Sequence, residues 1–299
     1  MYINSSICIS YQPSFLNENL IEHLQPVGEN GTLQHPDYKQ YVSPVQLRRM
    51  SAVLKMGVAA GVEALKQAGD AEADAIIVGT GLGCIHDTLK FVEAMYESEE
   101  GTLSPTAFIQ STHNSIAGQL ALLLGNRNYN MTHTQGNLSL GYALLDAKLL
   151  LAEGDAVQVL VGAVDEMTAD EHAIIAALAE KLNVPLPLLG EGSAFFHLSS
   201  AQTSTTFARI VRIKMGHNGK ADVLLSILAE AELILTNTDS FLSEAEHVRY
   251  TDYCGEFFTA SGFGLHLALM YLKAREALTH VLVHHRFGAQ EMGILVARA

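Results

Sequence analysis

Cysteine is scarce in this chain: the 299 residues include only Cys8, Cys84 and Cys254, which lie far apart. This number and spacing exclude a disulfide framework and a Cys-x-x-Cys metal pair. We therefore expect a reducing compartment and predict a cytoplasmic protein. The thirteen histidines show no metal-ligand spacing. His284 and His285 are neighbours on a predicted strand, so their side chains should point to opposite faces and cannot hold one metal ion.

Long apolar runs are also missing. Residues 144–151 and 174–178 are the longest candidates, and both are too short or too interrupted to cross a bilayer. The N-terminus lacks the basic region and long apolar run of a secretory signal. We therefore expect neither a membrane span nor a signal peptide.

Positive charge is in short supply. Eighteen Lys and Arg residues stand against thirty-two Asp and Glu, which gives a net charge of −14. This balance disfavours nucleic acid and anionic membranes as partners, because nothing offsets phosphate repulsion. Hydrophobic residues make up 48% of the chain and charged residues 17%. Such a composition is typical of a protein with much internal or subunit-buried surface.

What is present is an alternation of strands and helices along the whole chain, which predicts an α/β sheet with helix-covered faces. Strands are expected at 2–10, 75–78, 157–162, 207–213, 233–236, 281–285 and 292–297. Helices are expected at 44–65, 85–97, 115–124, 169–182, 221–229 and 258–272, with a further helix in the stretch 130–154. Residues 237–252 are expected to form a loop.

The stretch from Asn130 to Gly154 organises the chain. A polar strand-to-helix turn opens a helix that is apolar on nearly every side, so we expect this helix to be covered on all faces. The turn would place backbone N–H groups and small side chains in the interior. A nucleophile, if there were one, would lie there.

From Leu138 through the sequence Val-Gly-Ala-Val-Asp-Glu at 161–166, the chain resembles the nucleophile helix and following strand of the β-ketoacyl synthases. Further likenesses are Gly-Glu-Gly-Ser-Ala at 190–194 and Ser-Pro-Thr-Ala-Phe at 104–108. The resemblance implies an α/β thiolase-like fold of two duplicated halves in αβαβα layers. The N-terminal half would cover 1–204, and a shortened C-terminal half would cover 205–299.

The resemblance also gives the positions of the catalytic side chains, which in the family are one cysteine and two histidines. Counting back from the helix end, the cysteine position falls on Asn137, or on Gly136 if one gap is allowed. Glu256 occupies the position of the second histidine. Asn237 is the nearest polar residue to that of the first. With all three reactive side chains replaced, we expect no catalysis by this chain alone.

The sequence His-Arg-Phe-Gly-Ala-Gln at 285–290 resembles the Phe-Gly-Gly turn of the family, with Phe287 as the residue that gates the pocket. The resemblance implies a substrate pocket formed by His133, Gln135, Gly136, Phe287 and Gly288. The substrate would be carried on the phosphopantetheine of an acyl carrier protein, and no other cofactor is expected.

Three functions are compatible with these features. The first is a non-catalytic subunit similar to a chain-length factor, paired with an active synthase in fatty acid, polyketide or aryl-polyene synthesis. Resemblance to short bacterial synthase-like proteins of aryl-polyene or flexirubin-type pathways supports it. The second is a malonyl decarboxylase or acyltransferase that uses the altered site. The third is a homodimeric acyl-binding protein.

Several local features have two interpretations. The glycine-rich turn at 79–83 is typical of a tight α/β turn, but could cradle a phosphate. His113 could be a base or a helix-capping residue. His133 could activate Ser139 or be structural. Glu191 could be an acid catalyst, but the resemblance implies a structural role. Cys84 and Cys254 are expected to be small buried residues, although Cys254 could be a low-pKa thiol.

Overall fold

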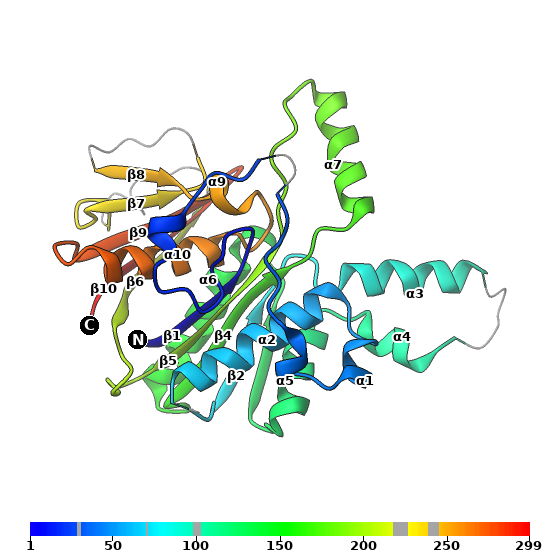
Figure 1. Ribbon diagram of the computed structural model, residues 1–299, viewed down its shortest axis with the longest axis horizontal. Helices are drawn as coiled ribbons and strands as arrows, with labels where there is room; N and C mark the ends of the chain where they lie inside the picture. Colours follow the sequence, from blue (N-terminus) through cyan, green and yellow to red (C-terminus); the bar gives the residue numbers. More distant parts are fainter. Residues whose placement is uncertain (29–30, 70, 98–102, 218–226, 239–244) are drawn as a thin grey trace.

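The computed structural model describes residues 1–28, 31–69, 71–97, 103–217, 227–238 and 245–299 (Figure 1). Ten strands form one mixed sheet in the order β3-β2-β4-β5-β1-β6-β10-β9-β7-β8. Their bounds are β1 Tyr2–Ile9, β2 Ala75–Gly79, β3 Tyr129–His133, β4 Gln158–Asp165, β5 Gly192–Ser199, β6 Ala208–His217, β7 Leu233–Thr236, β8 Glu246–Arg249, β9 His280–Phe287 and β10 Gln290–Arg298. The mixed α/β architecture predicted from the alternating pattern is confirmed.

The first five strands and the last five follow the same pairing scheme. β5 pairs antiparallel with β1 and β4, and β2 pairs parallel with β4 and β3. In the second set, β10 pairs antiparallel with β6 and β9, and β7 pairs parallel with β9 and β8. A short antiparallel contact between β1 and β6, Tyr2 opposite Arg209 and Ile3 opposite Ala208, joins the two sets into one sheet.

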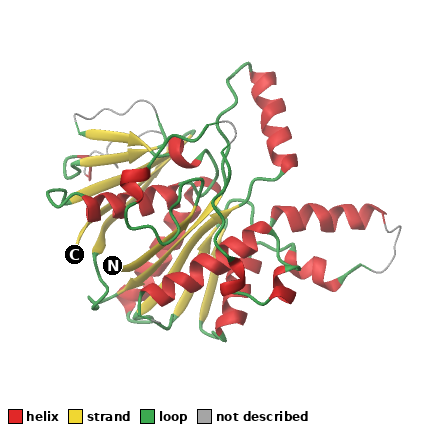
Figure 2. Cartoon of the chain, viewed as in Figure 1, coloured by secondary structure: helices red, strands yellow, loops and turns green. Residues whose placement is uncertain are grey.

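Helices cover the sheet on both faces (Figures 1 and 2). Their bounds are α1 Pro44–Leu47, α2 Ala52–Gln67, α3 Ile85–Glu97, α4 Pro105–Gln110, α5 Ser115–Leu124, α6 Ser139–Glu153, α7 Ala169–Leu182, α9 Thr251–Cys254 and α10 Ser261–Ala274. Short 3-10 helices are η1 Leu20–His23, η2 Tyr38–Gln40 and η3 Gly136–Leu138. The helix expected at 221–229 falls largely outside the described residues.

Two helices, α6 and α10, lie between the two sets of strands. α6 packs on β2, β3 and β4 and also contacts β6, while α10 packs on β9 and β10 and also contacts β1 and β5. α6 packs closely against β6 and β10. A Cβ added at Gly141 of α6 would lie 2.9 Å from the Met215 sulfur and would clash with Met292. α2 and α5 cover the opposite face of the first set of strands.

The expectation that the helix at 139–153 is covered on all faces is wrong. Tyr142 and Leu149 of α6 are 39% and 59% exposed, because this side of the helix lies beside β3, the strand at the edge of the sheet. The fully enclosed helix is α10, in which every residue from Ser261 to Leu272 is buried. The expected loop at 237–252 is also corrected, since β8 lies within it and α9 begins in it.

Helices α3, α4 and α7 project away from the body of the molecule (Figure 1). α7 begins with a capping box formed by Thr168 and Glu171. It leaves Ile174, Leu178 and Leu182 more than half exposed, four residues apart on one side. In the described part of the chain, no helix combines the length and apolar composition needed to cross a bilayer.

Candidate functional site

Asn137 lies in the turn between β3 and α6. The turn is folded by Ser139, whose hydroxyl donates to the carbonyl oxygens of Thr80 and Gly136 at 2.9 and 2.7 Å. Gly136 has a φ of +54°, a left-handed conformation that glycine adopts at little cost. The Asn137 side chain is therefore directed inward and is only 9% exposed. The sequence prediction of a polar group buried at this helix start is confirmed.

The buried partner of Asn137 is His285 on β9. The Asn137 amide nitrogen lies 3.1 Å from the His285 Nε2, and the other ring nitrogen, Nδ1, bonds the Tyr250 hydroxyl. Burial, together with neighbouring His284, lowers the pKa of His285 to about 3, so the ring is neutral at physiological pH. If the amide donates to Nε2, the ring proton is on Nδ1, which then donates to the hydroxyl oxygen of Tyr250.

This arrangement limits the chemistry that the site can perform. An amide cannot form a thioester, and an imidazole with a pKa near 3 is a poor general base at neutral pH. The Asn137 amide nitrogen and the His285 Nε2 are also engaged with each other. The site therefore holds a neutral, internally bonded polar pair where a nucleophile and its base would be needed.

Phe258 packs against this turn. A Cβ added at Gly136 would lie 3.7 Å from the Phe258 ring, and one added at Gly81 would clash with it. The two glycines therefore allow the ring to pack directly on the β2 and β3 turns. Phe258 comes from the segment before α10, so both sets of strands contribute to this site.

The glycine-rich turn after β2 is directed at a carboxylate. Asp165, at the end of β4, accepts hydrogen bonds from the Thr80 and Thr259 hydroxyls at 2.8 Å and from the backbone N–H groups of Gly81 and Leu82 at 2.8 and 3.3 Å. Because Asp165 occupies these N–H groups, the tight-turn interpretation is confirmed over a phosphate site. Burial raises the pKa of Asp165 to about 6, against the opposing effect of these bonds.

The next residue, Glu166, accepts from the backbone N–H groups of Val53 and His86 at 3.3 and 3.2 Å. Burial raises its pKa to about 7. Glu191 accepts from the N–H of Met167, which fits the structural role expected for it. Among the described residues, no group of histidine, cysteine and carboxylate side chains could hold a metal ion.

Asn237 and Glu256 contact other residues, away from Asn137. The Asn237 side chain donates to the carbonyl oxygen of Arg286 at 2.9 Å and accepts from its N–H at 2.8 Å, so it extends the pairing between β7 and β9. Glu256 lies 3.6 Å from the Arg249 guanidinium, and burial raises the pKa of its carboxyl. The structure brings His285, rather than either of these side chains, into contact with Asn137.

The residues expected to line a substrate pocket are dispersed. His133 bonds Asp146 at 2.9 Å and stacks near Tyr142. Gln135 is exposed, and Phe287 is 59% exposed at the end of β9. Gly288 forms the exposed β9–β10 turn with a φ of +57°.

The structure does not assemble either of the two catalytic arrangements that involve His133 or His113. His133 is engaged by Asp146, whereas Ser139 donates to backbone carbonyls, so the structural interpretation of His133 holds. His113 is exposed beside Gly83, just before the start of α5.

The three cysteines are all free and buried. Burial raises the pKa of Cys8 to about 12 and also raises the pKa of Cys84 and of Cys254. Glu256 raises the pKa of Cys254 further, so the low-pKa alternative for this thiol is wrong.

We therefore expect iodoacetamide at pH 8 to alkylate the native thiols on the order of a hundredfold more slowly than a free cysteine, because reaction needs an exposed thiolate. Mass spectrometry checks the result. The denatured chain, in which all three cysteines should react, is the control. Rapid single modification of the native protein would show a reactive thiol and contradict the expectation.

The sequence analysis missed His285 as a partner of Asn137. Strand alternation correctly predicted that His284 and His285 face opposite sides: His284 bonds the Thr236 hydroxyl, while His285 faces Asn137. Nothing in the spacing indicated that β9 passes the turn before α6. Phe258 and Tyr250 were missed for the same reason.

The profile of the family described as "Beta-ketoacyl synthase, N-terminal domain" matches residues 25–242. The chain is similar to "3-oxoacyl-[acyl-carrier-protein] synthase 2" of Vibrio cholerae, with 26% identity over 170 residues, or 55% of this chain and 37% of that protein. The corresponding protein of Vibrio harveyi is 28% identical over the same shares. The match thus spans little more than a third of these relatives.

Solved structures share the fold over nearly the whole chain. One is described as "The ishigamide ketosynthase/chain length factor", with a TM-score of 0.81, 16% identity and 99% coverage of both chains. Another is "Ketosynthase (ApeO) in Complex with its Chain Length Factor (ApeC) from Xenorhabdus doucetiae", with a TM-score of 0.63, 15% identity and full coverage of both chains. At these identities the likeness establishes the thiolase-like ketosynthase fold.

Proposed function

Because this chain belongs to the β-ketoacyl synthase family through its N-terminal domain, we propose that it is a non-condensing subunit of the chain-length-factor type. It acts with an active synthase in fatty acid, polyketide or aryl-polyene synthesis. In this proposal, Asn137, Asn237 and Glu256 stand at the family's catalytic positions. None of these three side chains is a sulfur nucleophile or an imidazole.

The observation that carries the proposal is the buried Asn137–His285 pair. An amide at the start of α6, bonded at 3.1 Å to an imidazole whose pKa is about 3, offers neither a nucleophile nor a base. A condensing enzyme must first hold the acyl chain on a thiolate. The framework around the pair is retained, as expected for a subunit kept for binding rather than bond formation.

A partner surface is available at the β3 edge of the sheet. β3 pairs with β2 on one side only, and its Tyr129 and Met131 are each 39% exposed. Leu122 of α5 and Leu149 of α6, on helices that contact or flank this strand, are 79% and 59% exposed. An open edge strand flanked by apolar side chains favours pairing with another chain. We assign this edge surface to the synthase partner.

The substrate would arrive on the phosphopantetheine of an acyl carrier protein. With a net charge of −14, this chain is poorly suited to attract an acidic carrier by itself, so the partner synthase supplies the docking surface. His133, Gln135, Gly136, Phe287 and Gly288 remain our proposed pocket residues, completed when the partner covers the exposed members.

We also propose that residues 1–204 and 205–299 are duplicated halves. The shared pairing scheme of their strands supports this, and α6 and α10 then occupy equivalent places between them. Free, buried thiols are compatible with the reducing cytosol that we propose as its location.

Reconstitution tests the proposal. Purified protein is mixed with malonyl- and acyl-loaded carrier, with and without a candidate synthase, and products are analysed by mass spectrometry. We expect no turnover by the chain alone and a change of roughly tenfold in the yield or length distribution of the synthase products when it is added, because the pocket is completed at the interface. Unaided formation of a longer β-keto product would refute the proposal.

A matched pair of variants locates the partner surface. Met131→Lys places a charge in the middle of the β3 edge. It should reduce the effect of this chain on the synthase products roughly tenfold, since burying an unpaired charge at an interface is costly. Val45→Lys, at a 54% exposed position on α1, is the control and should behave as wild type. If both variants change the synthase products equally, the β3 edge is not the surface that binds the synthase.

One observation favours malonyl decarboxylation as a second candidate. The Asn137 amide directs one N–H at neutral His285 and has a second, and neutral N–H donors can stabilise an enolate oxygen. Release of carbon dioxide from malonyl-loaded carrier by the chain alone would support this function. Acyl binding without turnover and without a synthase effect would instead support a homodimeric acyl-binding protein.

A further inference from the structure

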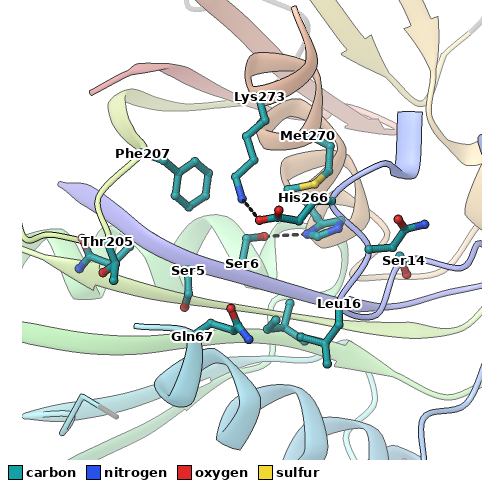
Figure 3. A pocket seen from close by; sticks show the side chains of 14 residues that line it. Ser5, Ser6, Ser14, Leu16, Gln67, Thr205, Phe207, His266, Met270 and Lys273 are labelled. Atoms are coloured by element: carbon teal, nitrogen blue, oxygen red, sulfur yellow. Dashed lines mark hydrogen bonds and ion pairs between the residues drawn. The ribbon is translucent and has the colours of Figure 1, made fainter. Parts of the chain in front are cut away.

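A cavity of about 570 Å³ lies between β1, the C-terminal part of α10 and the end of α2, at the seam of the two sets of strands (Figure 3). Its lining does not include Asn137, His285 or Phe258. Its size is within the range of small-molecule sites. The cavity is therefore separate from the site described above.

Most polar side chains in the lining already have their hydrogen bonds. Asn4 donates to Ser199 and bonds His197, and its oxygen accepts from Thr203. Ser5 donates to the carbonyl oxygen of Ala64, and Ser14 to that of Cys8. These groups shape the cavity and have little capacity left for a ligand.

The unused capacity lies at Ser6 and His266, which face each other from β1 and α10 (Figure 3). The Ser6 hydroxyl lies 2.8 Å from the His266 Nδ1. The other nitrogen, Nε2, is buried and has no hydrogen-bond partner among the described residues. A buried orphan acceptor costs less than a buried orphan N–H, so the ring proton belongs on Nδ1. Ser6 then accepts from the ring and keeps its own hydrogen free to donate.

This pair is suited to binding rather than catalysis. Burial, together with Lys273, lowers the pKa of His266 to about 3. With its proton on Nδ1, the nitrogen that faces Ser6 has no free lone pair for the proton of an attacking serine, and a ring of such low pKa is a weak base. Ser6 is therefore a fixed donor and not an activated nucleophile.

Lys273 provides a second donor on the same cavity. Its side chain extends from α10 toward the strand that carries Ser6, with the ammonium 4.4 Å from the centre of the Phe207 ring (Figure 3). Its ion-pair partner is Glu18, at 3.4 Å, whose side chain is 84% exposed. A long, solvent-exposed ion pair of this kind is weak. The Glu18 carboxylate thus occupies the position beside the Lys273 ammonium that an anionic ligand would take.

The loop that carries Glu18 is strained at the cavity mouth. Leu16 has a φ of +57° and is 51% exposed, although it is an apolar, non-glycine residue. Such conformations persist where surrounding contacts impose them, and they often border ligand sites. Leu16, Phe207 and Met270 supply the apolar part of the lining.

We propose that this cavity binds a small monocarboxylate with an apolar body. The ligand carboxylate displaces Glu18 from the Lys273 ammonium and accepts from the Ser6 hydroxyl. Its apolar body lies against Phe207 and Met270. The proposal is independent of the synthase-partner function, because it involves neither the β3 edge nor Asn137.

Binding is tested with benzoate, 3-phenylpropanoate and hexanoate, alongside benzamide and inorganic phosphate. Saturation-transfer NMR and calorimetry on the full chain provide the readout. We expect saturable binding of at least one carboxylate and none of benzamide, because the charge on Lys273 selects the anion. Failure of all three carboxylates, or equal binding of phosphate, would overturn the proposal.

Four variants assign the site. Lys273→Gln should weaken carboxylate binding by about tenfold, while Lys273→Arg should retain it, since the charge is kept. Glu18→Gln should strengthen binding roughly threefold by removing the competing carboxylate. Lys148→Gln, at an exposed position on α6, is the control and should bind as wild type. Binding that is insensitive to both Lys273→Gln and Glu18→Gln would place the ligand elsewhere and refute the assignment.

Discussion

Lowering the pH from 7.5 to 4.5 is expected to remove up to about 5 kcal/mol from the free energy of unfolding, a large part of the stability of an ordinary domain. The cause is a set of four buried neutral histidines. Burial lowers their pKa values, to about 4 for His197 and His284 and to about 3 for His266 and His285. The unfolded chain, with histidine pKa values near 6.5, takes up protons that the folded chain refuses.

Two buried carboxyls oppose this effect of the histidines. Asp165 and Glu166 have folded pKa values raised to about 6 and 7, so they add stability as the pH falls. The pKa values of Glu191 and Glu256 are raised in the same sense. At pH 4.5 each histidine costs about 2.5 kcal/mol, whereas Asp165 and Glu166 together return about 5. The histidines therefore outweigh the carboxyls.

Urea unfolding at a series of pH values measures this balance. His284→Asn should reduce the loss of stability between pH 7.5 and 5 by about 2 kcal/mol, since one protonation site of the unfolded chain is removed. His23→Gln, at an exposed position, is the control and should leave the difference unchanged. Stability that stayed level or rose down to pH 4.5 would contradict the expectation.

Replacing Asp165 by alanine is expected to destabilise the protein by about 4 kcal/mol, in the upper range for single substitutions. Four donors would lose their acceptor: the Thr80 and Thr259 hydroxyls and the N–H groups of Gly81 and Leu82. Thr259 precedes α10, whereas the other three follow β2. The carboxylate therefore ties the two sets of strands together beside the Asn137 turn.

Asp165→Asn is the matched comparison. One amide oxygen can still accept at the position that receives three of the four bonds, and the amide nitrogen can donate to the Thr259 hydroxyl. We therefore expect a loss of only about 1–2 kcal/mol. Denaturant unfolding at pH 7.5 measures both variants. An alanine variant within about 1 kcal/mol of wild type would show that water or rearranged side chains replace the carboxylate.

The turn before α6 joins these observations to the proposed function. Its shape depends on Ser139 and Gly136, and Phe258 packs over it from the other set of strands. These contacts fix the position of Asn137, and its amide is bonded to neutral His285. In the proposed function, this turn is the scaffold of a reactive site that has been kept around a pair without a nucleophile.

Much of the fold was predictable from local patterns. Strands at 2–10, 75–78 and 233–236 were expected within one residue of their observed ends, because apolar β-branched runs bounded by turn residues are local signals. The helix starts at Ser115 and Ala169 were likewise expected, whereas the single helix expected at 44–65 is divided into α1 and α2. Prediction was wrong where the surroundings decide: α6 is partly exposed because it lies beside an edge strand, and 246–254 forms β8 and α9.

The sequence by itself determined the fold class, the absence of a cysteine from the turn before α6, and the opposite orientation of His284 and His285, since each depends on residue identity or on the period of a strand. Only the tertiary structure decided that His285 meets Asn137, that Asp165 fills the glycine turn, and that Ser6 lies against His266. These pairs are separated by 148, 84 and 260 positions in the chain. Such contacts depend on how the strands are ordered in the sheet, and strand order is set by the summed packing of the whole core rather than by any local pattern.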